Sequence, residues 1–480
     1  MSWICGAHWD IGTSKRMKKI PAPKDIPEEI RQPLLEKRRE KLYIPVKSKL
    51  SAALAFSFLW VLVSAYLAIP WYRDLSAHLY HPLPEIIILS LALIPGWAMS
   101  FLVFSLILDR RPQYADLPFD APRVTLLCAA YNEEETITDT LESLWLQKYP
   151  GHLRIVVIDD GSKDKTAEKV REFIAQHQSS DKSFELIQHG KNQGKAAALR
   201  TGLKIVDTEY VVTIDADSYL FEHAMENLIR NIVLGPENTA AIAGNVLVRN
   251  SRKNLITKLQ EWDYFHGIAV IKRVQSLFQG TLVAQGAFSV YRTDAVREIG
   301  GWPPQIGEDI VLTWGLRNRG YRIGYAENAF CFTKVPETYK QFFHQRKRWA
   351  RGLIEAFKSY PDSLTRLKMS SPFIWYNLFF PLIDGAYLLF FLPGVIAAVF
   401  FHYYIIVGMM TVLLLPLAIL ANILFFGHQQ KIFKAYGLKV RRNLLGLIVY
   451  LLAYQAIMAP ATMAGYLSEM MNLTKRWGTK

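Results

Sequence analysis

Hydrophobic and polar positions divide the chain into apolar runs at both ends and a central region of mixed character. Residues 50–69 are apolar without a charge, and residues 86–108 repeat this pattern. Each run is long enough to cross ~30 Å of hydrocarbon as a helix. The sequence therefore predicts two transmembrane helices ahead of the central region.

Apolar residues return in two blocks after the central region. The first covers 371–426 and is interrupted by Asp384 and His402, and the second covers 444–471 and contains Pro460. The first block is long enough for two helices. We expect these two crossings near 384–401 and 404–426, and a third crossing in the second block.

Three crossings after the central region would place the C-terminus on the opposite side of the membrane from it. One apolar segment is therefore expected to be interfacial or re-entrant, either near 371–383 or around Pro460. Residues 431–442 are basic and amphipathic, which is typical of a segment at the cytosolic membrane surface.

The central region alternates short apolar runs with stretches of helical period. This alternation predicts an α/β domain with a mostly parallel sheet, whose ligands bind beyond the carboxyl ends of the strands. The predicted strands are 124–130, 155–158 and 210–214, and the predicted helices are near 134–147, 164–177 and 195–206.

The net charge of +14 gives information about the partners of the protein and not about its fold. Lys and Arg concentrate in residues 14–48 and at Arg110 and Arg111, beside apolar runs. A lipid bilayer explains this distribution, and we expect no nucleic-acid partner. The same cations predict that residues 1–48 and the chain after residue 109 lie in the cytosol.

Polar residues follow each predicted strand. Asp215 and Asp217 are separated by one residue, so both carboxylates can turn toward one hard divalent cation. Asp160, in Asp-Asp-Gly 159–161, can accept hydrogen bonds from a nucleotide base or ribose. For each motif a solvated strand-end turn is the alternative.

Lys195 follows Asn-Gln-Gly at the start of a predicted helix, which suits an anionic phosphate. A GxxxxGK[ST] loop is missing from the sequence, which argues against an ATPase.

Two further motifs lie later in the central region. Gly-Glu-Asp at 307–309 offers the acidic pair Glu308 and Asp309, one of which could act as a general base. Gln-Arg-Lys-Arg-Trp at 345–349 offers cations that could face a diphosphate leaving group. The alternative for this second motif is a basic amphipathic helix on lipid headgroups.

Together these motifs resemble the catalytic domain of family 2, GT-A-fold glycosyltransferases over residues 122–352. The resemblance rests on DDG at 159–161, DAD at 215–217, GED at 307–309 and QRKRW at 345–349, the last matching the Q(Q/R)xRW motif of membrane-embedded polysaccharide synthases. It implies a GT-A (Rossmann-like) cytosolic domain inserted between transmembrane helices.

The resemblance also implies roles for individual residues. Asp309, beside Glu308, matches the catalytic base, and Asp215 and Asp217 match acids that hold Mg²⁺ or Mn²⁺ with the sugar nucleotide. The residues that match the nucleotide site are Tyr131, Glu133, Asp160, Lys195, Arg346 and Arg348, and those that match the acceptor site are Gln345, Arg348 and Trp349.

The last residues of the chain, 477–480, read WGTK and are similar to an element of hyaluronan and chitin synthases. That likeness implies that Trp477 belongs to a cytosolic segment covering the nucleotide; a basic membrane-flanking tail is the alternative. Other phrases, such as 271–275 and 336–338, are most similar to bacterial poly-β-1,6-N-acetylglucosamine synthases.

The leading hypothesis is a processive inverting synthase in the plasma (inner) membrane that polymerises a UDP-sugar, with UDP-GlcNAc as the expected donor, into a β-linked glycan and extrudes it through its own transmembrane channel. A small membrane accessory subunit is a further expected partner. The alternatives are a hyaluronan, chitin or cellulose-type synthase, a single-transfer lipid glycosyltransferase, and a membrane scaffold. The expected domains are a basic segment (1–48), two transmembrane helices (49–109), the GT-A domain (110–360), and interface and transmembrane helices with the tail (361–480).

Overall fold

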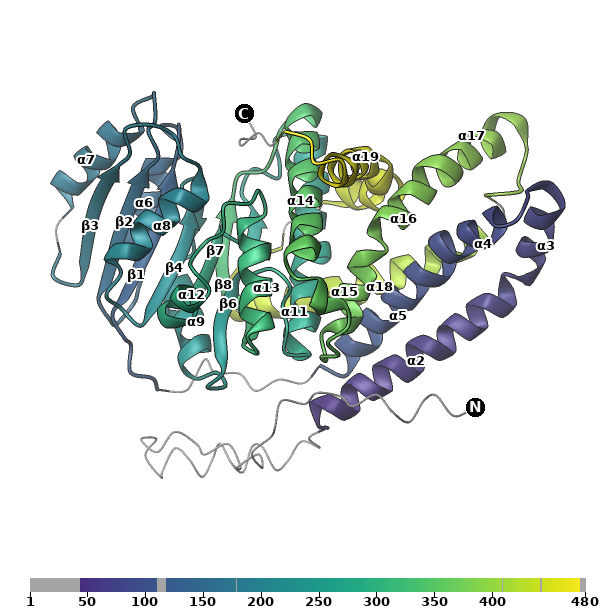
Figure 1. Cartoon of the computed structure of the whole chain (residues 1–480), viewed down its shortest axis with the longest axis horizontal. Helices are drawn as coiled ribbons and strands as arrows, with labels where there is room; N and C mark the ends of the chain where they lie inside the picture. Colours follow the sequence, from purple (N-terminus) through teal and green to yellow (C-terminus); the bar gives the residue numbers. More distant parts are fainter. Residues whose placement is uncertain (1–43, 110–117, 178, 408, 441–442, 475–480) are drawn as a thin grey trace.

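The computed structural model describes residues 44–109, 118–177, 179–407, 409–440 and 443–474. A sheet with its helices lies at one end, and long apolar helices lie at the other (Figure 1). Helix α14 (Tyr339–Ser359) stands between these two parts (Figure 1).

The sheet has eight strands in the order β3-β2-β1-β4-β7-β6-β8-β5. Strands β1 to β4 pair in parallel, which confirms the predicted alternation. Strand β7 runs antiparallel to both β4 and β6, an interruption that the sequence did not predict. The strands are β1 (Val124–Ala130), β2 (Leu153–Asp159), β3 (Lys182–Gln188), β4 (Tyr210–Asp215), β5 (Ser218–Leu220), β6 (Thr239–Val248), β7 (Phe288–Arg292) and β8 (Arg322–Thr333).

Helices cover both faces of the sheet, because successive strand residues point to opposite sides. Leu126 packs in the core with α6, α7 and α9, and Leu127 packs in the core with α8, α12 and α13. Both faces are therefore buried, as parallel strands require. The helices of this part are α6 (Ile137–Trp145), α7 (Thr166–Gln176), α8 (Lys195–Ile205), α9 (Ala224–Val233), α10 (Leu255–Trp262), the π-helix η2 (Asp263–Ile268), α11 (Ala269–Leu277), α12 (Thr293–Glu298), α13 (Glu308–Asn318) and the short η3 (Pro361–Leu364).

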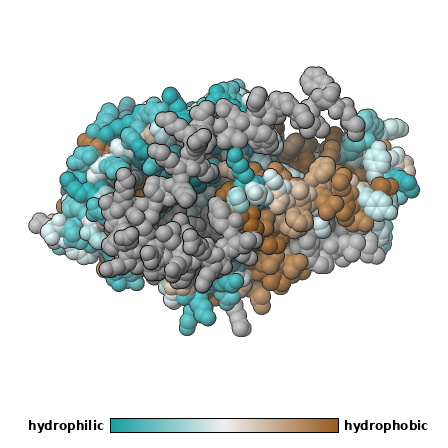
Figure 2. Space-filling model, turned by 90° about the horizontal axis from the view of Figure 1, so that it is seen from below, coloured by the Kyte–Doolittle hydropathy of each residue, from teal (hydrophilic) through white to brown (hydrophobic). Residues whose placement is uncertain are grey.

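Four helical stretches among the described residues are long and apolar enough to cross a membrane: Val46–Leu67, Leu83–Ile107, Ser371–Phe401 and Leu444–Met470. Hydrophobic residues gather on the side of the molecule where α2 lies (Figure 2). The elements of this part are α2 (Val46–Leu67), α3 (Ile69–His78), α4 (Leu83–Ile88), η1 (Leu89–Leu93), α5 (Ile94–Ile107), α15 (Ser371–Leu378), α16 (Phe380–Ala386), η4 (Tyr387–Phe391), α17 (Leu392–Phe401), α18 (Met409–Ala435) and α19 (Leu444–Met470).

The third candidate span differs from the prediction. It begins at Ser371 rather than near 384, so the segment 371–383 belongs to the span and Asp384 lies within it. The carboxylate of Asp384 accepts hydrogen bonds from Gln455 Nε2 and Thr462 Oγ1 of α19, each at 2.6 Å. These partners satisfy a polar group that would otherwise interrupt an apolar segment.

The crossing predicted at 404–426 falls largely on α18 and stays a prediction. Two other features of the predicted spans can be compared with the structure. Pro460 lies inside the continuous helix α19, so the chain is helical where a re-entrant break was an option. Helix α2 begins at Val46, within the segment 1–48 that was expected to precede the first span.

Candidate active site

The carboxyl ends of β1, β2 and β4 meet at one edge of the sheet. Ala130 pairs with Asp159, and Ala129 pairs with Asp215, so the motifs that follow these strands are neighbours. The structure thus brings together the strand-end residues that are far apart in the sequence.

Asp160 is buried and hydrogen-bonded within this edge. Its carboxylate accepts from the backbone N–H groups of Gln193 (3.0 Å) and Gly194 (2.6 Å), and it lies 2.7 Å from His189 Nδ1. These contacts fix the loop that opens α8 and so position Lys195. The predicted contact between Asp160 and a nucleotide stays a prediction, and His189 is a residue that the sequence did not single out.

Lys195 reaches from the first turn of α8 into the acidic cluster. Its ammonium donates to Asp215 Oδ1 and lies 3.7 Å from Glu308 Oε1. Burial alone would lower the pKa of Lys195, but Asp215 and Glu308 outweigh it and hold that pKa above its usual value. A Cβ atom at Gly286 would lie 2.6 Å from the ammonium, so a side chain at this position would displace the ammonium of Lys195.

Asp217 lies in the most acidic part of the site. Its Oδ1 accepts from Thr333 Oγ1 at 3.1 Å. Burial, followed by the charges of Asp215 and Glu133, raises the pKa of Asp217 to about 7. The neighbouring acids make an added positive charge favourable, so the residues present fit a divalent cation.

The described residues contain no group of three or more His, Cys, Asp or Glu side chains arranged to hold a metal by themselves. Two carboxylates without a third protein ligand suit Mg²⁺ or Mn²⁺, because such ions are often completed by water and substrate phosphates.

Glu308 and Asp309 form the first turn of α13. Asp309 accepts from the backbone N–H groups of Ile310 (2.8 Å) and Gly286 (3.2 Å), which orient its carboxylate. Burial raises the pKa of Glu308 to about 7; Lys195 opposes this shift and Asp309 reinforces it. The two acids are therefore held differently, although they are adjacent in the sequence.

A contact between two glycines sets α13 against α14. A Cβ atom at Gly307 would lie 2.5 Å from the Cα of Gly352, so the backbones approach too closely for any side chain at Gly307. The backbone N–H of Gly307 also donates to Glu355 Oε2 at 2.9 Å. This packing places the start of α13, which holds Asp309, beside the helix α14 that holds the Gln-Arg-Lys-Arg-Trp motif.

Arg346 of that motif points toward η2. Its guanidinium is buried, pairs with Asp263 Oδ2 at 2.9 Å, and lies 4.0 Å from the ring centroid of Trp349. The Trp349 ring is 40% exposed, so one part of it is open to a ligand while Arg346 holds it in place. Asp263 has no motif around it and could not be recognised from sequence.

The other predicted residues are placed as follows. Arg348 is close enough to Glu308 to oppose the rise in its pKa. The Gln345 Oε1 atom is buried and has no hydrogen-bond partner among the described residues. Tyr131 is exposed beyond β1, and Glu133 Oε2 accepts from Thr136 Oγ1 at 2.9 Å.

Trp477 lies outside the described residues. The chain that leads to it reaches α14, because Arg351 donates to the carbonyl oxygen of Thr474 at 3.1 Å. This contact brings residue 474 close to the α14 motif, and the covering role of Trp477 stays a prediction.

Lys272 of α11 is a buried cation near the acids that the sequence did not assign to the site. Its ammonium donates to the carbonyl oxygen of Val283. Burial lowers the pKa of Lys272 to about 7, and the charge of Asp309 opposes that shift.

The fold and the strand-end acids define the GT-A class of Rossmann-like domains. A mannosyltransferase from Pyrobaculum calidifontis, solved in complex with GDP-Man and Mn²⁺, has the same fold, with a TM-score of 0.51 and 21% identity over 81% of this chain and 99% of that chain.

Within that class, residues 125–300 form a domain that matches the family described as glycosyl transferase family 2. Two curated relatives, both called poly-beta-1,6-N-acetyl-D-glucosamine synthase, come from Staphylococcus epidermidis (36% identical) and Staphylococcus aureus strain COL (37% identical). Each match runs over 230 residues, which is 48% of this chain and 54% of the relative. The chain thus matches about half the length of these relatives.

Proposed function

We infer that this protein is a membrane polysaccharide synthase that transfers N-acetylglucosamine from UDP-GlcNAc to a growing β-linked glycan. The observation that carries the proposal is the contact between Gly307 and Gly352, which joins the acids of α13 to the Gln-Arg-Lys-Arg-Trp helix. The names of the staphylococcal relatives support the sugar and the polymeric product.

The donor binds at the strand-end edge. Tyr131, Glu133 and Asp160 contact the uridine, with Asp160 also fixing the loop before Lys195. A divalent cation held by Asp215 and Asp217 neutralises charge on the diphosphate when it is bound. The residues that approach the diphosphate and close the nucleotide site are Lys195, Arg346, Arg348 and Trp477.

Lys195 must exchange partners when the donor binds. Its ammonium pairs with Asp215, and the phosphate oxygens of a donor would offer it a competing negative charge. Asp215 would then be able to hold a divalent cation together with Asp217.

Asp309 acts as the base. It removes the proton from an acceptor hydroxyl, whose oxygen attacks the anomeric carbon while the bond from that carbon to UDP breaks. In-line attack inverts an α-linked donor into a β-linkage. The backbone N–H groups of Ile310 and Gly286 hold the Asp309 carboxylate for this transfer.

The acceptor occupies the α14 side of the site. Gln345 and Arg348 hydrogen-bond the terminal sugar, and Trp349 stacks on it, since an exposed indole face suits a sugar ring. The glycan then leaves among the four candidate spans, with the catalytic domain (110–360) in the cytosol and the protein in the plasma (inner) membrane. A small membrane accessory subunit is a further proposed partner.

A donor panel tests this assignment. Purified full-length protein is incubated with UDP-GlcNAc, UDP-glucose, UDP-glucuronic acid and GDP-mannose, each with Mn²⁺ or Mg²⁺, and release of the nucleoside diphosphate is measured. Among these donors, UDP-GlcNAc is the one that should give sustained turnover. Turnover with UDP-glucose instead would indicate a cellulose-type synthase. Turnover that requires UDP-glucuronic acid together with UDP-GlcNAc would indicate a hyaluronan-type synthase.

A further inference from the structure

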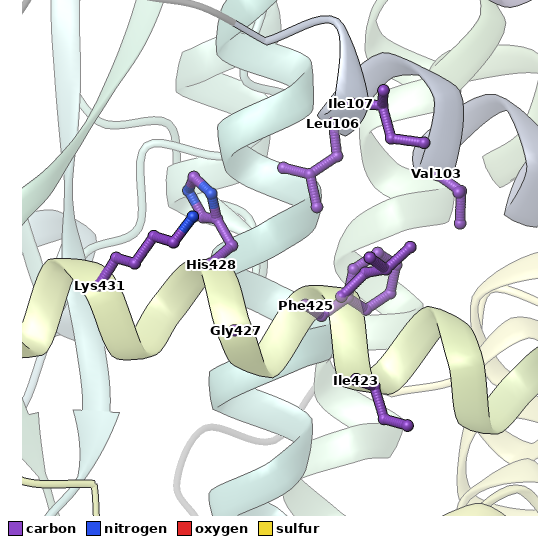
Figure 3. Close-up of a pocket in the computed structure, with 9 residues that line it drawn as sticks. Val103, Leu106, Ile107, Ile423, Phe425, Gly427, His428 and Lys431 are labelled. Carbon is purple, nitrogen blue, oxygen red and sulfur yellow. The ribbon is translucent and has the colours of Figure 1, made fainter.

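A pocket of about 270 Å³ lies between α5 and α18, away from the strand-end acids. One wall carries Leu106 and Ile107, and the other carries Ile423 and Phe425 (Figure 3). His428 and Lys431 lie together at one end of the pocket (Figure 3). The pocket is therefore apolar along its length and basic at one end.

The apolar walls are open to the surroundings. Ile107 is 59% exposed and Ile423 is 61% exposed, although both are large aliphatic side chains. Ile107 is also the last residue of the candidate span Leu83–Ile107. The basic end of the pocket therefore lies where a transmembrane helix ends and lipid headgroups begin.

We propose that this pocket binds an anionic phospholipid. One acyl chain lies along the Ile107 and Ile423 walls, and the headgroup phosphate meets Lys431 and His428. Charge complementarity selects the occupant, because the ammonium group of a zwitterionic headgroup would offset the phosphate charge and be repelled by Lys431, whereas an anionic headgroup carries no such cation. The proposal does not depend on which sugar the catalytic domain transfers.

The basic end is connected to the catalytic sheet. His428 Nε2 lies 3.7 Å from Glu327 of β8, and Glu327 also pairs with Arg273 of α11. Arg273 in turn pairs with Asp109, at the end of α5, at 2.7 Å. A headgroup at His428 would thus adjoin the set of charges that joins α5 and α11 to the sheet.

Native mass spectrometry of the full-length protein in detergent tests the proposal, with phosphatidylglycerol and phosphatidylcholine supplied at equal concentration. Wild type should retain phosphatidylglycerol at least about fivefold more tightly, and Lys431→Gln should reduce that preference about fivefold. Lys434→Gln is the matched control, since Lys434 is exposed on the same helix and does not line the pocket.

A second variant blocks the acyl chain instead of the headgroup. A Cβ atom at Gly427 would meet no atom within 4 Å, so Gly427→Leu can place its side chain in the pocket without a clash at Cβ. It should lower phosphatidylglycerol binding while leaving the melting temperature without lipid near that of wild type. Equal retention of both lipids by wild type, or a copurifying polypeptide that Gly427→Leu releases, would overturn the proposal.

Discussion

Buried charges are arranged differently in two regions of the molecule. One is the strand-end site, and the other is the junction between the sheet and the candidate membrane-spanning helices, where Arg273 and Arg351 lie. At the strand ends, Asp217 and Glu308 each have a pKa raised to about 7, because burial and neighbouring acids disfavour their ionised forms. Lys195 is the cation that pairs with both Asp215 and Glu308. The site therefore holds more negative than positive charge.

At the junction, two buried arginines have carboxylate partners. Arg273 pairs with Asp109 and Glu327, and Arg351 pairs with Glu469 at 3.0 Å. Buried ion pairs between arginine and a carboxylate hold elements together. Several buried carboxylates close to one another destabilise a fold unless a ligand neutralises their charge. The difference indicates which charges serve binding and chemistry and which serve assembly. Arg346 pairs with Asp263, as the arginines at the junction pair with their carboxylates. Its motif nevertheless predicts that it contacts a ligand.

The largest effect is expected from Asp309→Asn. Loss of a general base should lower turnover by about 10²–10⁴-fold, while UDP binding changes little because the substitution preserves shape. Turnover follows from UDP release and binding from calorimetry. Asp362→Asn is the matched control, since Asp362 forms an exposed pair with Arg366. Unchanged turnover in Asp309→Asn would remove the acid from the mechanism.

Breaking one junction pair should destabilise the protein strongly. Arg351→Met leaves buried Glu469 with Lys358, at 3.5 Å, as a cationic neighbour, so we expect a loss of at most about 3–5 kcal/mol in the free energy of unfolding. The measurement is the melting temperature in detergent. The double variant Arg351→Met/Glu469→Leu should recover most of the loss, and the exposed control Arg366→Met should lose less than about 0.5 kcal/mol. If the double variant were as unstable as Arg351→Met, the loss would not come from leaving Glu469 without Arg351.

Divalent cations should stabilise the crowded site but not the junction. At about 100 times its Kd, Mn²⁺ or Mg²⁺ should add about 2.7 kcal/mol to the free energy of unfolding. Asp217→Asn should abolish this gain, and Asp139→Asn, which removes an exposed surface carboxylate, should keep it. Chelation with EDTA should stop turnover. If the cation stabilised Asp217→Asn as much as wild type, Asp217 would not be part of the cation site.

A pH dependence of stability is expected from Lys272. Its pKa of about 7 in the folded protein lies below its usual 10.5, so between these values the unfolded chain binds the extra proton. The free energy of unfolding should therefore rise with pH over that window, by up to about 1.4 kcal/mol per pH unit. Lys272→Met removes this contribution, so its melting temperature relative to wild type should fall from pH 7 to pH 9. The exposed control Lys253→Met should track wild type at both pH values.

Local sequence predicted strands β1, β2 and β4 and the motifs at their ends, because both depend on short-range patterns, but it did not predict β3, β5, β6 or β8. The buried run 124–130 is β1 as expected, and the acids at 159–160 and 215–217 follow β2 and β4. The antiparallel strand β7 could not be predicted, since its partners β4 and β6 are chosen by tertiary packing.

Partners from distant elements were also beyond the sequence. Asp263 is one more acid in a helical stretch until α14 folds against η2 and brings Arg346 to it. Lys272 looks like a surface lysine by composition, and only its burial among α11 and its neighbours makes it unusual. The start of the third span at Ser371 was missed because Asp384 was read as a boundary, whereas α19 supplies the hydrogen bonds that let it lie inside the helix.

The size of the product tests the central claim most directly. Wild-type protein in lipid nanodiscs is given radiolabelled UDP-GlcNAc and Mn²⁺, and the labelled product is separated by size as the reaction proceeds. The account predicts a high-mass glycan from early times that a β-N-acetylglucosaminidase digests, and no such product from Asp309→Asn. A single labelled glycolipid that never lengthens would contradict a polysaccharide synthase.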